Sequence, residues 1–217
     1  MNEETKQGSL FSICEKSDLF FYERDLSNKG YRSIAGIDEA GRGPLAGPVV
    51  AAAVILPGGL QMPGVNDSKK LTAQKREALF DVVMKNATAT GVGIAQPEEI
   101  DGINILQATL KAMIRAVDKL KTSPDYLIID GINAIDRDIP QQAIKKGDSL
   151  SISIAAASII AKVTRDRMML KYDKEYPSYG FASHKGYGSK IHREAIADLG
   201  PCPIHRKTFA GVKEHIK

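Results

Sequence analysis

The sequence contains few of the residues that mark specialised protein classes. Its 217 residues include two cysteines, no tryptophan and 6% aromatic residues. Cys14 and Cys202 lie near opposite ends of the chain without the spacing of a metal-ligand pair, so we expect both to be reduced and without a functional role. With 43% hydrophobic and 26% charged residues, the composition is that of an ordinary globular protein and excludes collagen-like, disordered and disulfide-stapled classes.

Long hydrophobic stretches are also absent. The longest uninterrupted apolar run, 49–56, is far shorter than the roughly 20 residues that span a bilayer. Residues 1–6 include acidic side chains where a secretory signal would carry positive charge. We therefore expect a cytoplasmic protein that has no membrane partner and that, at this length, folds as a single-domain monomer.

The chain is mildly basic, with a net charge of +4, and the positive charge is concentrated at the C-terminal end. Residues 184–217 contain seven Lys or Arg residues against three acidic ones, together with all four histidines. Such a segment is either a solvated basic tail or a surface for a polyanion such as nucleic acid. The histidines, among them His184 and His205, have no metal-ligand spacing, which favours a structural or phosphate-facing role.

The apolar pattern predicts strands that alternate with helices. A Gly/Pro loop joins the first two strands and suggests a hairpin, whereas helices separate the later strands. This order predicts an α/β domain over 31–217 that includes the basic C-terminal segment, with 1–30 as an extension that packs on the body. The predicted strands are 33–38, 49–56, 88–95 and 125–131, and the predicted helices are 72–86, 104–121 and 152–175.

Acidic residues stand at the ends of predicted strands or beside glycines. They are Asp38 and Glu39, Asp130, and Asp148. Each could be a loop or capping acid, and for Asp148 alone that interpretation is favoured. If the four meet, their charges must be neutralised, and Mg²⁺ or Mn²⁺ suits an all-oxygen donor set. Two such ions about 3.5–4 Å apart are the apparatus of phosphodiester hydrolysis.

Two glycine patterns near residue 40 are superficially like nucleotide-binding motifs. The first, from Gly36 to Gly43, lacks the Lys-Ser/Thr pair that contacts phosphates and Mg²⁺ in a phosphate-binding loop. The second, from Gly41 to Gly47, is flanked by Pro44 and Pro48 and precedes a strand rather than a helix. Neither pattern predicts a nucleotide site.

The sequence resembles the ribonuclease HII family over about residues 30–210. The longest shared motif is 36–49, Gly-Ile-Asp-Glu-Ala-Gly-Arg-Gly-Pro-Leu-Ala-Gly-Pro-Val, and further motifs follow in the family's order. These are 67–71 (Asp-Ser-Lys-Lys-Leu), 130–131 (Asp-Gly), 146–149 (Lys-Gly-Asp-Ser), 155–166 and 184–188 (His-Lys-Gly-Tyr-Gly).

The resemblance implies an RNase H-like fold, a mixed central β-sheet flanked by helices with a C-terminal helical portion. It implies an enzyme that cleaves the RNA strand of RNA/DNA hybrids and incises 5′ to single ribonucleotides in duplex DNA, leaving a 3′-hydroxyl and a 5′-phosphate. The family's four catalytic and metal-binding acids correspond to Asp38, Glu39, Asp130 and Asp148. Asp166 competes for the fourth place, and we prefer Asp148 because the family acid lies in the Lys-Gly-Asp segment.

The resemblance also assigns substrate-binding residues. Gly41, Arg42 and Gly43 correspond to a loop that recognises the ribose, where glycines let backbone groups approach a 2′-hydroxyl closely. Tyr187 corresponds to a tyrosine that packs on the adjacent deoxyribose. Further candidate substrate contacts are Lys69, Lys185 and Arg206.

Two alternatives remain open at this point. Ribonuclease HIII resembles this fold but has an additional N-terminal domain and prefers glutamate as the fourth acid. A non-catalytic hybrid-binding module would be expected to lose at least one of the four acids, and none is lost here. Residues 212–217 contain no motif specific enough to predict contact with a replication clamp.

Overall fold

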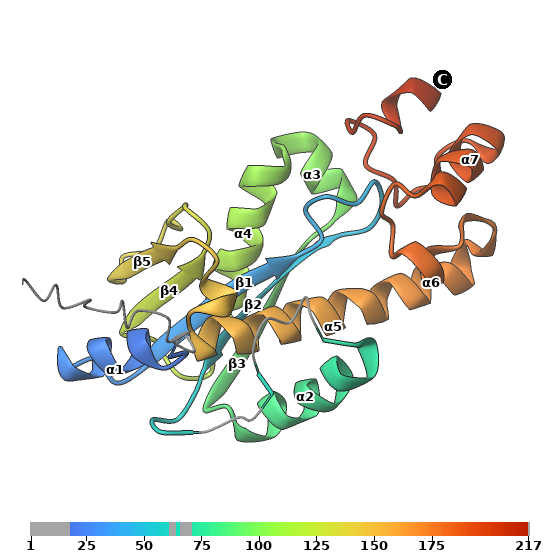
Figure 1. Ribbon diagram of the computed structural model, residues 1–217. Helices are drawn as coiled ribbons and strands as arrows, with labels where there is room; N and C mark the ends of the chain where they lie inside the picture. Colours follow the sequence, from blue (N-terminus) through green and yellow to red (C-terminus); the bar gives the residue numbers. More distant parts are fainter. Residues whose placement is uncertain (1–17, 61–63, 66–70, 217) are drawn as a thin grey trace, which may run out of the picture.

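The described residues of this computed structural model, 18–60, 64–65 and 71–216, form a five-stranded sheet with helices on both faces (Figure 1). The strands are β1 (Ile34–Ala40), β2 (Val49–Ile55), β3 (Ala89–Ala95), β4 (Tyr126–Asp130) and β5 (Gln141–Ile144). The α-helices are α1 (Phe21–Asn28), α2 (Ala73–Asn86), α3 (Pro97–Ile103), α4 (Ile105–Asp118), α5 (Ile152–Glu175), α6 (Phe181–His184) and α7 (Lys190–Leu199), and the short 3₁₀ helices are η2 (Gly147–Ser149), η3 (Pro177–Tyr179) and η4 (Lys213–His215).

The sheet is mixed, in the order β3-β2-β1-β4-β5. β1, β2 and β3 pair antiparallel, whereas β4 and β5 continue the sheet parallel to β1. β1 is therefore the central strand, and its C-terminal end lies beside that of β4. This arrangement confirms the predicted mixed sheet with an antiparallel beginning.

Glycines on the sheet allow one helix to lie close on each face. A Cβ on Gly36 would come within 2.2 Å of the backbone of Ser153, so only glycine lets α5 approach β1 this closely. A Cβ on Gly93 would meet the carbonyl oxygen of Ala112 at 1.9 Å, so β3 needs glycine beneath α4. α2 packs on α5 and completes that layer (Figure 1).

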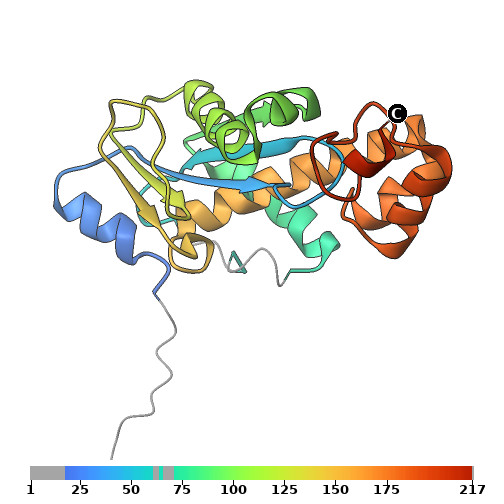
Figure 2. The same cartoon turned by 90° about the horizontal axis from the view of Figure 1, so that it is seen from above.

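Residues 176–216, here called the C-terminal lobe, gather at one end of the molecule, and α1 lies at the opposite end (Figures 1 and 2). The loop between β1 and β2 joins this lobe. The backbone N–H of Leu45 donates to Gly186 at 2.8 Å, and the N–H of Gly47 donates to Ile204 at 2.9 Å. The end of β1 is thereby attached to the segment that carries Tyr187.

Most predicted elements are confirmed, with shifted ends. Thr72 caps α2 as predicted, since its hydroxyl accepts from the backbone N–H of Lys75 at 3.3 Å. The first strand does not end at Asp38 but pairs with β2 through Ala40. α3 and β5 were not predicted, and Asn104, with a φ of 69°, separates α3 from the predicted helix after it.

None of the helices within the described ranges is long and apolar enough to cross a membrane.

Candidate active site

Three of the predicted acids meet where β1 and β4 end. The two strands are parallel and pair Ile37 with Ile129, so the next residues, Asp38 and Asp130, lie side by side at the same edge. Both line a cavity of about 390 Å³, and Glu39 lines it too. A parallel pair of strands thus brings together acids that are about ninety residues apart in the sequence.

Asp38 is a buried carboxyl group with a strongly shifted pKa. Its side chain is 3% exposed, and it accepts from the backbone N–H of Glu39 at 2.7 Å and from the Ser158 hydroxyl. Burial raises the pKa of Asp38 well above its usual range, and the nearby charges of Glu39 and Asp130 raise it further. A positive charge placed among these carboxylates would relieve both effects.

Glu39 lies between two cavities. Adjacent strand residues face opposite sides of a sheet, and β1 continues to Ala40, so Glu39 does not share the face of Asp38. It lines both the main cavity and a second one of about 150 Å³ that extends towards Thr109 on α4. Asp130 also lines both cavities.

Asp148 is placed near this group but does not line the main cavity. It is buried in η2, and the backbone N–H of its neighbour Gly147 donates to Asp130 Oδ1 at 2.7 Å. In the described part of the chain, no three Asp, Glu, His or Cys side chains are arranged to hold one ion. The carboxylate oxygens still fit a hard divalent cation by chemistry and charge, so a shared ion would require some of these side chains to rotate.

Two cationic side chains that the sequence analysis did not single out, Arg76 and Lys162, line the main cavity with the acids. Arg76 of α2 and Lys162 of α5 line the main cavity with Arg42, which pairs with Glu39 at 3.2 Å. Asp166 pairs with Lys162 at 2.7 Å and lies 3.8 Å from Arg76. Asp166 does not itself line the main cavity, and its carboxylate interacts with the two cations that do.

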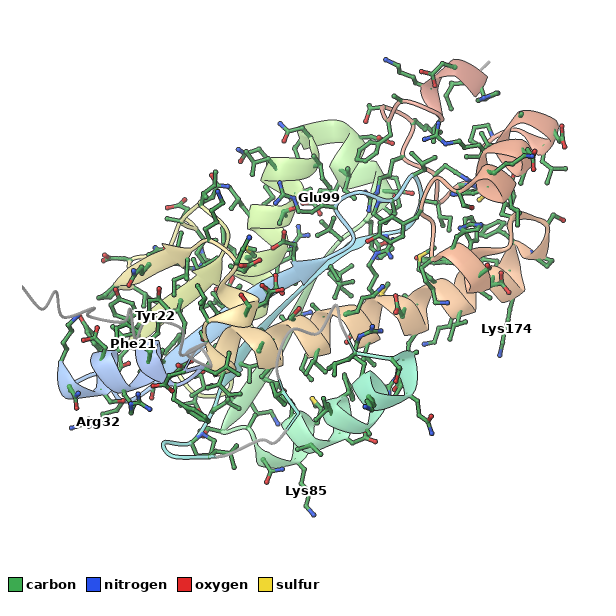
Figure 3. All side chains as sticks on the ribbon, viewed as in Figure 1. Phe21, Tyr22, Arg32, Lys85, Glu99 and Lys174 are labelled. Carbon is green, nitrogen blue, oxygen red and sulfur yellow. The ribbon has the colours of Figure 1, made fainter. Side chains whose placement is uncertain are left out.

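The spacing of residues along α5 could have indicated Lys162 in the sequence. Ser158, Lys162 and Asp166 are four residues apart, so they share one face of a helix. Lysines at the helix ends differ from Lys162: Lys85 on α2 and Lys174 on α5 point away from the body (Figure 3). Nothing comparable marks Arg76, since only the tertiary packing of α2 on α5 brings it to the cavity.

The glycine loop and Tyr187 lie on the side of the cavity nearest the C-terminal lobe. Gly41, Arg42 and Gly43 line the cavity, and Gly41 has a φ of 102°, which favours glycine. Tyr187 also lines it and is 48% exposed. A Cβ on Gly43 would lie 3.7 Å from the Tyr187 ring, so the loop and the ring are neighbours.

The other candidate substrate contacts have different surroundings. Arg206 is fully buried, and its guanidinium donates to the carbonyl oxygens of Gly41, Arg42 and Gly47, so it supports the glycine loop from below. Lys185 is half-buried, and its ammonium group donates to the carbonyl oxygen of Ala182 in α6. Lys69 lies outside the described residues.

Three histidines, His184, His192 and His205, pack against one another behind Tyr187. The N–H of Cys202 donates to His205 Nδ1 at 3.0 Å, which leaves the proton on Nε2 to bond His192 Nε2 at 3.0 Å. His192 Nδ1 then donates to the carbonyl oxygen of Tyr187 at 2.9 Å. Burial lowers the pKa of both histidines to about 4 and raises the pKa of Cys202 to about 11. These groups are therefore neutral and structural at pH 7.

Comparison with known proteins identifies relatives over nearly the whole chain. The model of the family described as ribonuclease HII matches residues 35–212. A ribonuclease HII of Geobacter metallireducens is 63% identical over 95% of this chain and 97% of its own length. A ribonuclease HII of Citrifermentans bemidjiense is 67% identical over 92% of this chain and 86% of its own length.

A solved structure shows the same fold. The crystal structure of the ribonuclease H2 from Pyrococcus horikoshii OT3 is similar to this chain with a TM-score of 0.71 and 29% sequence identity. The similarity covers 84% of this chain and 96% of that one. The sheet order and the flanking helices are thus those of an RNase H fold.

Proposed function

The chain belongs to the ribonuclease HII family and is a ribonuclease H enzyme, and from this premise we propose how it selects and cuts its nucleic-acid substrate. It hydrolyses the RNA strand of RNA/DNA hybrids and also incises 5′ to single ribonucleotides embedded in duplex DNA. The products carry a 3′-hydroxyl and a 5′-phosphate. The observation that supports this most directly is the cavity that Asp38, Glu39 and Asp130 share with the glycine loop and Tyr187.

The acids form the catalytic group. Asp38, Glu39, Asp130 and Asp148 would hold Mg²⁺ or Mn²⁺, and two such ions, when bound, would supply activation of a water and stabilisation of the leaving oxygen. The chain's own contribution is to hold the carboxylates in position. Pairing of β1 with β4 sets the position of Asp38 beside Asp130, and the N–H of Gly147 orients the Asp130 carboxylate.

The cations and the loop would bind the substrate. Arg76 and Lys162 line the same cavity as the acids, and their positive charge would offset the repulsion between the carboxylates and an approaching phosphate. The backbone of Gly41, Arg42 and Gly43 reads the 2′-hydroxyl of the ribonucleotide, and the exposed ring of Tyr187 packs on the next sugar. Arg76 and Lys162 would thus bind the phosphate, and the glycine loop and Tyr187 would bind the sugars.

A nicking assay tests this function. A labelled DNA duplex with one internal ribonucleotide is incubated with Mg²⁺ or with EDTA, and the ends of the products are mapped. We expect a single cut 5′ to the ribonucleotide with Mg²⁺ and no cut with EDTA. An uncut duplex in Mg²⁺ and in Mn²⁺, or products with a 3′-phosphate, would overturn the proposal.

Substitution of Asp130 separates chemistry from binding. Asp130→Asn should reduce cleavage by roughly a hundredfold or more, the loss typical of removing one group that stabilises transition-state charge. Binding of a fluorescent RNA/DNA hybrid should remain within a few-fold of wild type, because the phosphate contacts come from Arg76 and Lys162. Near-normal turnover in this variant would exclude Asp130 from the catalytic group.

A further inference from the structure

Two buried arginines lie beneath the loop of residues 41–48, and neither forms an ion pair within 4 Å with a carboxylate of the described residues, although Asp101 and Asp166 lie near enough to influence Arg206 and Arg165. Arg165 of α5 and Arg206 of the C-terminal lobe are both 0% exposed. Burial lowers the pKa of Arg206 to about 9, and the neighbouring charge of Arg165 contributes to this shift. Burying two charges of the same sign destabilises a fold. The retention of both arginines therefore suggests that they have a role other than stability.

Both guanidinium groups bond to the loop backbone. Arg206 donates to the carbonyl oxygens of Gly41, Arg42 and Gly47. Arg165 donates to the carbonyl oxygens of Ala46 at 3.1 Å and Pro48 at 3.0 Å, and to that of Lys185 at 3.0 Å. The two guanidinium groups therefore bind both ends of the loop, and Arg165 also connects the loop to the segment that leads to Tyr187.

The contacts of Arg206 determine which way two peptide groups face. In a trans peptide the C=O of one residue and the N–H of the next point in opposite directions. The carbonyl groups of Gly41 and Arg42 point to Arg206, so the N–H groups of Arg42 and Gly43 point away from it. Both residues are exposed and line the main cavity, and no described residue accepts from either N–H.

We propose that Arg206 and Arg165 are positioning residues for sugar recognition, an inference that rests on the proposed function. By donating to the loop's carbonyl groups, Arg206 holds the loop so that the N–H groups of Arg42 and Gly43 point into the cavity and the carbonyl oxygens of Gly41 and Arg42 do not. The loop then reads the 2′ oxygen as a hydrogen-bond acceptor. Arg165 sets the distance between this loop and Tyr187, because its guanidinium bonds to both segments.

The test measures discrimination of a single hydroxyl. Two fluorescent duplexes that differ only in one ribose or deoxyribose are titrated in EDTA with wild type, Arg206→Met, Arg206→Lys and Arg165→Lys. The wild type should bind the ribose duplex more tightly. In Arg206→Met this preference should fall by roughly two- to tenfold, or to unity, the effect of losing a neutral N–H bond to the 2′ oxygen. The lysine variants should keep part of it, and affinity for the all-DNA duplex should stay unchanged.

Arg115→Met is a control for the loss of an arginine that bonds to a backbone carbonyl outside the site; the Arg115 side chain is 42% exposed. Arg115 of α4 also donates to a backbone carbonyl, that of Ile94 at 2.7 Å, and it pairs with Glu99 on the far side of the sheet from α5 (Figure 3). Its loss should lower the melting temperature without changing the preference.

The outcomes separate the inference from the proposed function. Equal weakening of both duplexes, or an unchanged preference in the folded Arg206 and Arg165 variants, would overturn the positioning role. If Arg206→Met does not fold, the two lysine variants decide. A wild-type protein that binds both duplexes equally would overturn the proposed ribose recognition as well.

Discussion

At the scale of single residues, the site contains groups that are costly for the fold on their own. Asp38 is buried beside two other carboxylates, and Arg165 and Arg206 are buried and donate to backbone carbonyl oxygens. The acids line the main cavity, whereas the two guanidinium groups bind the backbone of the loop of residues 41–48.

The ring of Tyr187 gives a prediction at this scale. If the ring packs on the sugar that follows the ribonucleotide, a sugar without a 2′-hydroxyl fits best there. Tyr187→Ala should therefore reduce cleavage at a single embedded ribonucleotide by roughly ten- to a hundredfold, since an aromatic stacking contact is worth about 1–3 kcal/mol. Cleavage of a continuous RNA/DNA hybrid should fall less. Parallel rate measurements on the two substrates check this, and an equal loss on both would make Tyr187 a packing residue.

The repulsion around Asp38 gives a second prediction. A divalent ion that binds only the folded acids should stabilise the protein by about 2.7 kcal/mol at a hundredfold excess over its dissociation constant. The melting temperature should rise when Mn²⁺ or Mg²⁺ is added. In EDTA, Asp38→Asn should melt at a higher temperature than wild type, because the folded state no longer buries a carboxylate whose pKa is raised.

The same melting curves also show whether the stabilisation by the added ion depends on Asp38. Asp38→Asn should gain less from the added ion than wild type does. If the variant gains as much, or if wild type gains nothing, the acids around Asp38 do not share a cation site.

At the scale of elements, α1 and α5 support each other although they are far apart in sequence. Glu23 of α1 accepts from the Ser151 hydroxyl at 2.6 Å and from the backbone N–H of Ser153 at 3.0 Å. Ser151 in turn caps α5 by accepting from Ile154 at 3.2 Å. Because α5 carries Ser158 and Lys162 to the cavity, its start must be held against β1.

Loss of the Glu23 contacts at the start of α5 should destabilise the fold. Glu23→Ala should lower the free energy of unfolding by about 1–2 kcal/mol, the usual cost of losing an acidic group at a helix start. Urea unfolding measures the change. Asp25→Ala is the matched control on the same helix, since Asp25 pairs with Lys29 at the surface, and it should cost less than about 0.5 kcal/mol. Similar losses in both variants would show that α1 as a whole, rather than the contacts of Glu23, stabilises α5.

At the scale of the whole molecule, the active site joins the sheet to the C-terminal lobe. The sheet contributes the acids, and the lobe contributes Tyr187 and the buried Arg206. The neutral bond between His192 and His205 holds the lobe together behind Tyr187. The integrity of the lobe should therefore depend on pH.

The direction of that dependence follows from the two pKa values. His192 and His205 stay neutral in the folded protein down to about pH 4, whereas in the unfolded chain they bind protons below about pH 6.5. The unfolded state thus binds more protons between these limits, and stability should fall as the pH is lowered from about 6.5 to about 4. Thermal melts across this range measure the slope. His205→Gln should reduce the slope, and an unchanged slope in that variant would assign the acid sensitivity to other groups.

The sequence alone determined the family, the mixed sheet and the identity of the candidate acids. Strands and helices follow from local periodicity, and the motif of residues 36–49 is long enough to be recognised without a structure. Thr72 and the start of α2 were predictable because a capping side chain bonds to a backbone N–H only three residues later, which is a local contact.

Only the tertiary structure decided which groups share the cavity. Arg76 reaches it through the packing of α2 on α5, and the sequence contains no spacing that reports this contact. Arg206 lies in a basic segment and was expected to face phosphate, yet the structure buries it beneath a loop more than 150 residues earlier in the chain. Composition records how many charges a segment has, whereas burial and hydrogen bonding depend on contacts between residues that are distant in sequence, and those contacts form only when the chain folds.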